Sequence, residues 1–219
     1  MSARTSSRFG KPLYPVDSLG RKEATQVHRD VAEETIEALK KSGRKVKVQR
    51  DYLLQPEDFE GVDLVCSLGG DGTFLKTASQ IKSTKLPIVG VNTDPARSVG
   101  HLTSIPIQYS EKQREIPRFI DYLNQSNFRF FPKQRIRVKH QSQTTEAIKI
   151  TYALNEVFVA EKLLSQPSIF RLKADEQYMG KFNSRGCIIA TGTGSTGWLY
   201  SAKRITHGDV EAVLGQLGF

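Results

Sequence analysis

Cysteine is scarce in this sequence, and long hydrophobic runs are absent. The two cysteines, Cys66 and Cys187, both lie in apolar stretches, where a cysteine is most simply a small buried hydrophobic side chain. They offer no disulfide framework and no Cys/His spacing typical of zinc, which indicates a reducing compartment. No apolar run approaches the ~18–20 residues of a membrane-spanning helix. We therefore expect a soluble protein with no membrane partner, and we assign no metal-ligating residue.

Acidic residues are in the minority, with 23 Asp and Glu against 32 Lys and Arg, which gives a net charge of +9. A basic excess suits polyanionic ligands, including nucleic acid. The basic residues are nevertheless dispersed, and no aromatic–arginine recognition pattern occurs, so we expect nucleotides and no nucleic acid as partners. With 219 residues, 38% of them hydrophobic and 25% charged, the chain can form one large globular domain or two small ones.

The first 16 residues contain three basic residues, several serines and no acidic residue. This composition is typical of a mitochondrial presequence, and it is equally typical of a disordered terminus. We therefore treat residues 1–20 as a disordered or targeting-like segment, with both alternatives open.

Hydrophobic periodicity predicts an α/β domain over residues 21–126. Apolar positions recur at three- and four-residue steps from Ala24 to Ala38, which predicts a helix that stops near Gly43. We expect a short strand at 45–50, apolar strands at 64–68 and 86–92, and helices at 74–81 and 116–125. This alternation favours a mostly parallel sheet with phosphate chemistry at the carboxyl ends of its strands.

Beyond residue 127 the pattern changes to short strands joined by polar loops, with little helical periodicity. The expected strands lie within residues 128–140, 149–161, 168–174 and 186–194. They predict a mostly β, sandwich-like domain over residues 127–219. A cleft between two such domains is a favoured place for a ligand.

The most informative segment joins an apolar strand to a helix through Gly69, Gly70, Asp71, Gly72 and Thr73. Glycines let backbone N–H groups approach an anion, and the following helix adds the positive end of its dipole. A carboxylate beside phosphate is costly unless it accepts a proton from a hydroxyl nucleophile or organises Mg²⁺. The alternative is a tight strand–helix turn in which Asp71 caps the helix. The number of glycines exceeds what a turn requires and favours phosphoryl transfer.

Two further motifs lie in the second half of the chain. Asn155 and Glu156 stand together in an otherwise apolar strand. They suit the hydroxyl and amide groups of a ligand or, alternatively, reach solvent from a strand edge. Residues 191–198, TGTGSTGW, offer three glycines, four hydroxyls and Trp198 to a nucleotide, and the alternative is a plain Gly/Thr loop.

In this order and spacing, the three motifs resemble those of the NAD kinase family. Residues 89–103, 153–161 and 190–198 are most similar to the mitochondrial type of animals, and the resemblance covers about residues 21–205. It implies ATP- and Mg²⁺-dependent phosphorylation of the 2′-hydroxyl of the adenosine ribose of NAD, which gives NADP. It also implies a homodimer located in mitochondria.

The resemblance implies a role for each matching position. Asp71 is the expected catalytic base, which takes the 2′-hydroxyl proton, and Asn155 and Glu156 are expected to hold NAD. The other expected nucleotide-binding residues are Gly69, Gly70, Gly72, Thr73, Lys76, Thr193, Ser195, Thr196, Gly197, Trp198 and Ser201. Three polar residues of a subfamily-specific loop, Asn92, Asp94 and His101, receive no role beyond lining the cleft.

The sequence departs from the family pattern in several places. Gly192, Gly197 and Trp198 replace commoner residues of the third motif, and Arg185 stands where many bacterial members have Asp. No counterpart of the family's first strand precedes the first predicted helix, and the chain stops 18 residues after Ser201. These two features predict an incomplete chain with an incomplete β domain. The open alternatives are a lipid kinase of the diacylglycerol or sphingosine type and a catalytically silent member.

Overall fold

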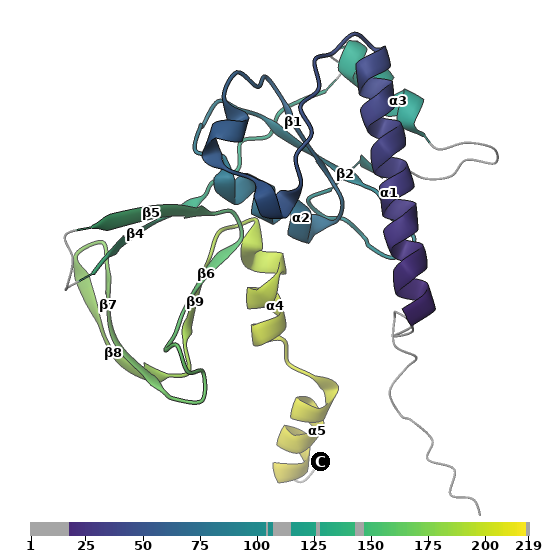
Figure 1. Ribbon diagram of the computed structural model, residues 1–219. Helices are drawn as coiled ribbons and strands as arrows, with labels where there is room; N and C mark the ends of the chain where they lie inside the picture. The colour runs from purple at the N-terminus through teal and green to yellow at the C-terminus, as the bar shows by residue number, and fades with distance from the viewer. Residues whose placement is uncertain (1–17, 104, 107–114, 126–127, 143–146, 218–219) are drawn as a thin grey trace, which may run out of the picture. The chain divides into compact units, whose positions relative to one another are not determined.

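The computed structural model describes residues 18–103, 105–106, 115–125, 128–142 and 147–217. The presequence-like composition of residues 1–16 therefore falls outside the described residues. The chain divides into two compact units, residues 1–130 and residues 131–219. Each has its own fold (Figure 1). None of the helices in the described ranges is long and apolar enough to cross a membrane.

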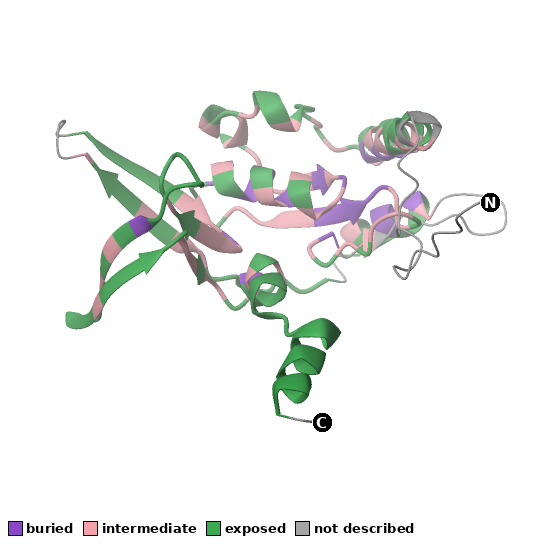
Figure 2. Ribbon diagram, turned by 90° about the horizontal axis from the view of Figure 1, so that it is seen from below, coloured by how far each residue is buried: buried purple, intermediate pink, exposed green. Residues whose placement is uncertain are grey.

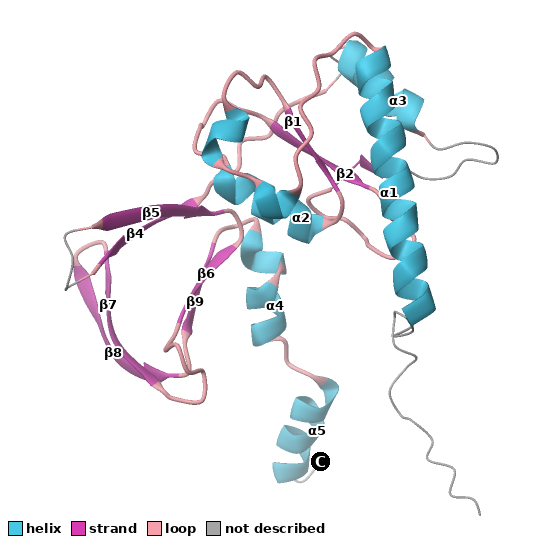
Figure 3. Ribbon diagram, viewed as in Figure 1, coloured by secondary structure: helices cyan, strands magenta, loops and turns pink. Residues whose placement is uncertain are grey.

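The first unit combines helices with a parallel sheet (Figure 3). Its elements are α1 (Ser18–Lys41), η1 (Asp51–Leu53), η2 (Pro56–Phe59), β1 (Val65–Leu68), α2 (Asp71–Gln80), β2 (Ile88–Asn92), β3 (Ile105–Pro106) and α3 (Ile116–Asn124). Strand β2 lies between β1 and β3 and pairs in parallel with both, with Leu68 opposite Val91 and Val91 opposite Ile105. The predicted α/β fold with a parallel sheet is confirmed.

Helix α1 follows the predicted periodicity. Val31 and Thr35 on its repeating face are buried, and Leu39 joins them one turn further on. The helix ends at Lys41. Gly43 follows with a φ of +83°, in the left-handed region that favours glycine. The predicted glycine stop is therefore confirmed.

The core of this unit lies between the sheet and the helix pair α1 and α3. Its buried members are Val31, Leu39, Val91, Ile116, Phe119 and Ile120. Val89 and Cys66 pack against this cluster from the sheet, whereas a side chain at Gly90 would meet the ring of Phe74 on α2. Because successive strand residues point to opposite faces, α2 covers the other face of the sheet. In Figure 2 the buried residues gather on the central strands and the helix sides that face them.

Two expectations for this unit are wrong. Residues 45–50 form no strand, because no described strand pairs with them: Val46 packs on the core, while Val48 is exposed. Helix α2 begins at Asp71, three residues earlier than predicted. The backbone N–H groups of Thr73 and Phe74 both donate to the carbonyl of Gly70, which closes the first helical turn directly after the glycines.

The second unit is built mainly from antiparallel strand pairs (Figure 1). Its elements are β4 (Ile136–Gln141), β5 (Ile148–Ala153), β6 (Glu156–Val159), β7 (Ser168–Ala174), β8 (Gln177–Ser184), β9 (Cys187–Ala190), η3 (Gly194–Thr196), α4 (Trp198–Lys203) and α5 (His207–Gln216). The described pairs are β4–β5, β6–β9 and β7–β8. The predicted β-rich character is confirmed, and a sandwich of larger sheets stays a prediction.

Several elements of this unit differ from the sequence expectations. The strand expected over residues 128–140 starts only at Ile136, and the part without a strand includes Pro132, which has no backbone N–H for a ladder hydrogen bond. Strand β8 was not expected, yet it pairs with β7 through a tight turn in which Asp175 and Glu176 both have positive φ. Helix α5 was also unexpected and begins at a capping box formed by Thr206 and Asp209.

Candidate active site

The glycine loop after β1 is fixed by backbone geometry. Gly69 has a φ of +147°, and a Cβ there would lie 2.8 Å from Thr73 Oγ1. Its N–H donates to the carbonyl of Val91 at 2.9 Å, which ties the loop to the end of β2. The fold therefore requires glycine at position 69, and the loop lies at the carboxyl ends of two parallel strands, where phosphate chemistry was predicted.

Asp71 is not the helix cap that the alternative interpretation proposed. Gly70 occupies the N-cap position and Asp71 is the first residue of α2. The Asp71 carboxylate turns instead to a distant segment and accepts four hydrogen bonds from it. The donors are His101 N at 3.0 Å, Leu102 N at 2.9 Å, Thr103 N at 3.2 Å and Thr103 Oγ1 at 3.3 Å. Three consecutive backbone N–H groups and a hydroxyl thus offset the charge of one carboxylate.

The donors belong to residues 93–103, which follow β2 and which we call the β2–β3 connection. Asn92, buried at the end of β2, braces this connection: its Nδ2 donates to Ser98 O at 2.9 Å, and its Oδ1 accepts from Asp94 N at 3.0 Å. Gly100 has a φ of +70°, and a Cβ there would lie 2.6 Å from Asn92 Nδ2. The packing leaves no room for a side chain at this position.

Helix α1 holds the outer side of the β2–β3 connection. Arg97 forms ion pairs with Asp94 at 3.0 Å and with Glu23 of α1 at 3.1 Å. These two carboxylates, Asp94 first, raise the pKa of Arg97. His28 of α1 lies 2.8 Å from Thr93 Oγ1 through its Nδ1. The segment that holds Asp71 is therefore itself anchored.

Gly72 and Lys76 differ from their neighbours in α2. A Cβ at Gly72 would meet nothing within 4 Å, so packing among the described residues does not demand glycine there. Lys76 is largely exposed, and its ammonium pairs with Asp51 of η1 at 3.1 Å. The expected roles of both residues in nucleotide binding stay predictions.

In the second unit, Asn155 and Glu156 lie at a break between strands and not inside one strand. β5 ends at Ala153, the chain bends, and β6 begins at Glu156 in a different ladder, where it pairs with Ala190 of β9. Asn155 Oδ1 and Glu156 Oε2 are both buried and have no hydrogen-bond partner among the described residues. Buried acceptors are normally satisfied, so these two atoms mark a place where donors from elsewhere fit.

The loop over residues 191–198 wraps around this break. Thr191 N donates to Asn155 O at 2.8 Å, and Thr191 Oγ1 donates to Leu154 O at 2.6 Å. Gly194 is buried against the backbone of Asn155, where a Cβ would collide with the carbonyl group. A Cβ at Gly197 would lie 3.5 Å from Glu156 Oε2 and 3.6 Å from Asn155 Nδ2. The second and third motifs therefore form one site.

Trp198, at the start of α4, packs on a protein ring. Its ring centroid lies 4.7 Å from that of Phe158 on β6, yet the side chain remains 48% exposed. About half of the surface of Trp198 therefore remains exposed. Ser195 Oγ donates to Gly192 O at 2.7 Å, while the hydroxyls of Thr193, Thr196 and Ser201 have no such contact among the described residues, and their nucleotide roles stay predictions.

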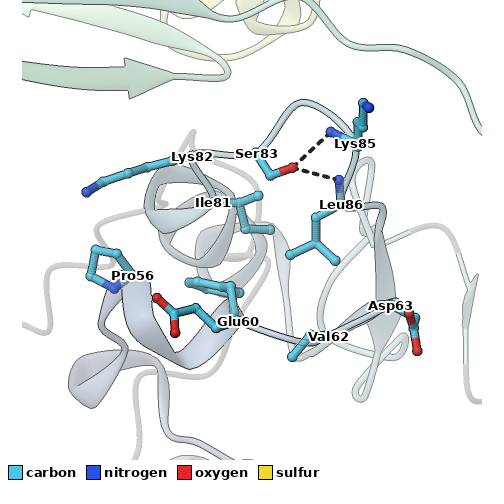
Figure 4. A pocket seen from close by; sticks show the side chains of 10 residues that line it. Pro56, Glu60, Val62, Asp63, Ile81, Lys82, Ser83, Lys85 and Leu86 are labelled. Atoms are coloured by element: carbon cyan, nitrogen blue, oxygen red, sulfur yellow. Dashed lines mark hydrogen bonds between the residues drawn. The ribbon is translucent and has the colours of Figure 1, made fainter.

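A separate hollow of about 410 Å³ lies at the other end of the parallel sheet (Figure 4). Val62 and Asp63 lead into β1, and Leu86 leads into β2, so the hollow opens at the amino ends of these strands. Its charged side chains spread around the rim and do not converge, as Figure 4 shows for Lys82 and Lys85. It is therefore not the candidate active site.

Sequence reasoning missed the residues that hold Asp71. The polar residues Asn92, Asp94 and His101 received no defined role from the sequence, and Leu102 and Thr103 were not singled out at all. The contacts from His101 and Leu102 use backbone N–H groups, which leave no side-chain signal. Gly100 was the available clue, because an isolated glycine can mark a close approach of the backbone to another segment.

Residues 3–124 match the family described as ATP-NAD kinase N-terminal domain. The chain belongs to this family. It is 30% identical to NAD kinase 2, mitochondrial, of Rattus norvegicus and of Homo sapiens, and each alignment covers 89% of this chain. The alignments cover 53% and 51% of those proteins, so the chain spans about half the length of these curated relatives.

Solved structures of the family are similar to the fold. An NAD kinase from Archaeoglobus fulgidus, determined in complex with ATP, matches with a TM-score of 0.56 and 25% identity over 80% of this chain and 61% of that chain. Yeast NADH kinase, complexed with NADH, matches with the same TM-score at 18% identity and supports the fold alone. The predicted NAD kinase family, with the animal mitochondrial type among its relatives, is confirmed.

Proposed function

We propose that this protein transfers the γ-phosphoryl group of ATP to the 2′-hydroxyl of the adenosine ribose of NAD, which yields NADP and ADP. Membership of the ATP-NAD kinase family supports the reaction class. The observation that carries the proposal is the carboxylate of Asp71, which is held at the carboxyl ends of two parallel strands beside a helix N-terminus. Anionic phosphates suit that position.

Asp71 acts as the base in this reaction. The substrate hydroxyl loses its proton to the carboxylate while its oxygen bonds to the γ-phosphorus. The bond between this phosphorus and the β–γ bridging oxygen breaks, and its electron pair stays on ADP. Four hydrogen-bond donors already offset the charge of Asp71, so a phosphate beside it is repelled less than it would be by a free carboxylate.

Gly72 supports close approach of a phosphate. Neither its φ nor its packing requires glycine. The absence of a side chain therefore leaves room for a ligand and is not needed by the fold. Gly192 in the third motif is a second such position, because a Cβ there would meet no described atom within 4 Å. Backbone N–H groups beside small residues are a common way to hold phosphate oxygens.

Asn155 and Glu156 hold the dinucleotide. Their buried, unpartnered oxygens accept from ribose hydroxyls or from the amide of the nicotinamide. Thr193, Ser195, Thr196, Gly197, Trp198 and Ser201 complete the nucleotide site of the second unit. The exposed part of Trp198 offers a surface for a base or ribose.

Mg²⁺ enters with ATP. The described residues contain no group of three or more His, Cys, Asp or Glu side chains that could hold a metal ion. Mg²⁺ is commonly held by substrate phosphates and water with only one or two carboxylates, so the ion would be held mainly by the phosphates of ATP. The ion would neutralise phosphate charge. The protein acts as a homodimer in mitochondria, as the names of its relatives suggest for the compartment.

The test is NADP formation by the purified 219-residue chain with ATP, Mg²⁺ and NAD. Diacylglycerol and sphingosine are offered as acceptors in parallel reactions with the same donor. We expect NADP and no phosphorylated lipid. A preparation that binds ATP and NAD in calorimetry but forms no NADP would support the silent alternative, and lipid phosphorylation would overturn the proposal.

A further inference from the structure

The two carboxylate oxygens of Asp71 have different surroundings. Oδ1 accepts from Leu102 N at 2.9 Å, Thr103 N at 3.2 Å and Thr103 Oγ1 at 3.3 Å. Oδ2 accepts a single hydrogen bond, from His101 N at 3.0 Å. Because a carboxylate oxygen has two lone pairs, the protein already uses the full acceptor capacity of Oδ1, and Oδ2 keeps a free direction.

We propose that Thr103 is a positioning residue that fixes Asp71 through Oδ1 and so leaves Oδ2 as the oxygen that receives the substrate proton. The inference rests on the proposed kinase function. In the reaction, the hydroxyl proton moves to Oδ2, the hydroxyl oxygen bonds to the γ-phosphorus, and ADP leaves with the electron pair of the broken bond. Thr103 itself touches neither the substrate nor the reacting atoms.

Packing leaves Thr103 little freedom to move. Its side chain is 1% exposed, so its hydroxyl cannot turn to solvent. A Cβ at Gly100 would lie 2.7 Å from Thr103 Oγ1, and one at Gly90 would lie 2.7 Å from Thr103 Cα. Two glycines thus make the space in which Thr103 reaches Asp71.

The rest of the β2–β3 connection keeps Thr103 there. Asn92 braces the connection from inside through Ser98 and Asp94. Arg97 ties it to Glu23 on α1. A positioning role needs such an anchor, because a carboxylate attached to a loose loop would follow the loop and lose its direction.

A purely structural role is the competing explanation, since the four hydrogen bonds also join α2 to the β2–β3 connection. The two explanations differ in what the loss of the hydroxyl changes. If the role is only structural, loss of the hydroxyl lowers stability and leaves the chemical step of the folded protein unchanged. A positioning residue affects kcat with little change in the KM for either substrate.

The kinetic test compares Thr103→Val with Thr103→Ser, both in the complete chain. Valine keeps the shape and removes the hydroxyl donor to Oδ1, so we expect kcat to fall about 10- to 150-fold, the value of one hydrogen bond to a charged group. The KM values for ATP and NAD should stay within about twofold, because Thr103 touches neither substrate and its loss affects only the chemical step. Serine restores the hydroxyl and should restore most of kcat.

Thr35→Val is the matched control, because Thr35 is also fully buried and its hydroxyl donates to Val31 O within α1, away from Asp71. A kcat that falls equally in both valine variants would overturn the proposal. So would a change confined to KM, or failure of serine to restore kcat.

Hydrogen exchange provides a readout that does not depend on catalysis. In Asp71→Ala, the amides of residues 101–103 lose their acceptor, and we expect them to exchange at least about tenfold faster than in the parent, while β2 stays protected. Unchanged exchange at these amides would contradict the proposal even if the chain makes NADP. If these amides exchange faster in Asp71→Ala but the parent chain makes no NADP, the proposed function and the catalytic part of the inference are refuted. The result would still show that residues 101–103 hold Asp71.

Discussion

The Asp71 loop and the Asn155–Glu156 site differ in how far the protein satisfies its own polar groups. Asp71 accepts four hydrogen bonds from the β2–β3 connection. Asn155 Oδ1 and Glu156 Oε2, both buried, accept none from the residues that the structure describes. The polar atoms of the first region are satisfied within the protein, and those of the second are not. On the proposed function, a bound ligand would supply the missing donors, so rigidity for chemistry and readiness for recognition would come from different units.

The difference carries an energetic consequence. A buried acceptor without a partner costs roughly 1–3 kcal/mol, so the Asn155–Glu156 site lowers the stability of the free protein. On the proposed function, a ligand that donates hydrogen bonds to these oxygens would return that free energy. The Asp71 loop carries no such cost. Variants of the two regions should therefore differ in stability. Removal of Asp71 should lower the free energy of unfolding, and removal of the unpartnered groups should not.

The largest expected effect is at Asp71. In Asp71→Asn, the amide cannot take a proton, and a positioned general base contributes about 10²–10⁴ in rate, so phosphoryl transfer should be lost by this factor. The Asn Nδ2 would also face one of the N–H donors, so unfolding should require less denaturant. NAD binding should remain largely intact.

Turnover, calorimetric NAD affinity and the urea midpoint are measured on the same preparation of Asp71→Asn. Turnover within threefold of the parent would rule out Asp71 as the base. An unchanged urea midpoint would show that the charge of Asp71 and the hydrogen bond at Oδ2 contribute no net stability.

The next effect concerns the second region. Replacement of both Asn155 and Glu156 by Ala should weaken NAD binding and leave ATP binding unchanged. Each lost hydrogen bond to the ligand is worth about 0.5–1.5 kcal/mol if neutral and about 1.5–3 if charged, so the Kd for NAD should rise roughly 30-fold or more.

Glu156→Gln sharpens this test, because it keeps the shape, removes the charge and supplies a donor. Calorimetry reports the affinities and denaturant unfolding reports stability. If the double variant binds NAD as well as the parent, the pair is structural. If it is also markedly less stable, the two buried oxygens have partners that their geometry does not suggest.

Two glycines beside Asp71 are expected to have different roles, and substitution of each by alanine should have a smaller effect than the changes above. Gly72→Ala places a helix-favouring residue in the first turn of α2 without a steric contact, so stability should hold or rise by up to about 1 kcal/mol while NADP formation falls. Gly69→Ala is the matched control, since its φ of +147° and its contact with Thr73 predict a loss of stability. Equal activity in Gly72→Ala and the parent would remove Gly72 from the phosphate site.

The sequence predicted the elements whose signals are local. The repeating face of α1, the strand before Gly69 and the glycine stop at Gly43 depend on neighbouring residues, and all three are present. The motifs also located the Asp71 loop and the Asn155–Glu156 pair, although their roles stay predictions. The family could be assigned for the same reason, because its motifs are short and contiguous.

What the sequence could not predict depends on contacts between distant backbone groups. The alternation at residues 45–50 has no partner strand within the part of the chain that the structure describes, so the prediction from periodicity alone was wrong. The donors to Asp71 lie 30 to 32 residues away and are mostly backbone N–H groups, which every residue except proline carries. Likewise, the break between β5 and β6 lies against Gly194 of another segment, where a side chain would collide with the backbone of Asn155.

The cysteines report on the two regions without affecting activity, because one lies on the strand that leads into each region. Cys66 lies on β1 before the Asp71 loop, and Cys187 lies on β9 before the 191–198 loop. Burial raises the pKa of the Cys66 thiol from its usual 9.0 to about 11. Because the thiolate is the reactive form, alkylation of Cys66 at pH 8 should be about 100-fold slower than that of an ordinary thiol.

The same shift fixes the pH dependence of stability. The pKa of Cys66 is higher in the folded protein than in the unfolded chain, so the contribution of this thiol to stability is fully present below pH 9 and is lost as the pH rises towards 11.

Mass spectrometry of alkylation at each cysteine from pH 7 to 10, with and without ATP and NAD, measures both regions at once. We expect nucleotides to slow modification of Cys187 more than that of Cys66, because the first region is already complete without a ligand. Equal protection of the two cysteines by nucleotides would contradict the contrast between the regions.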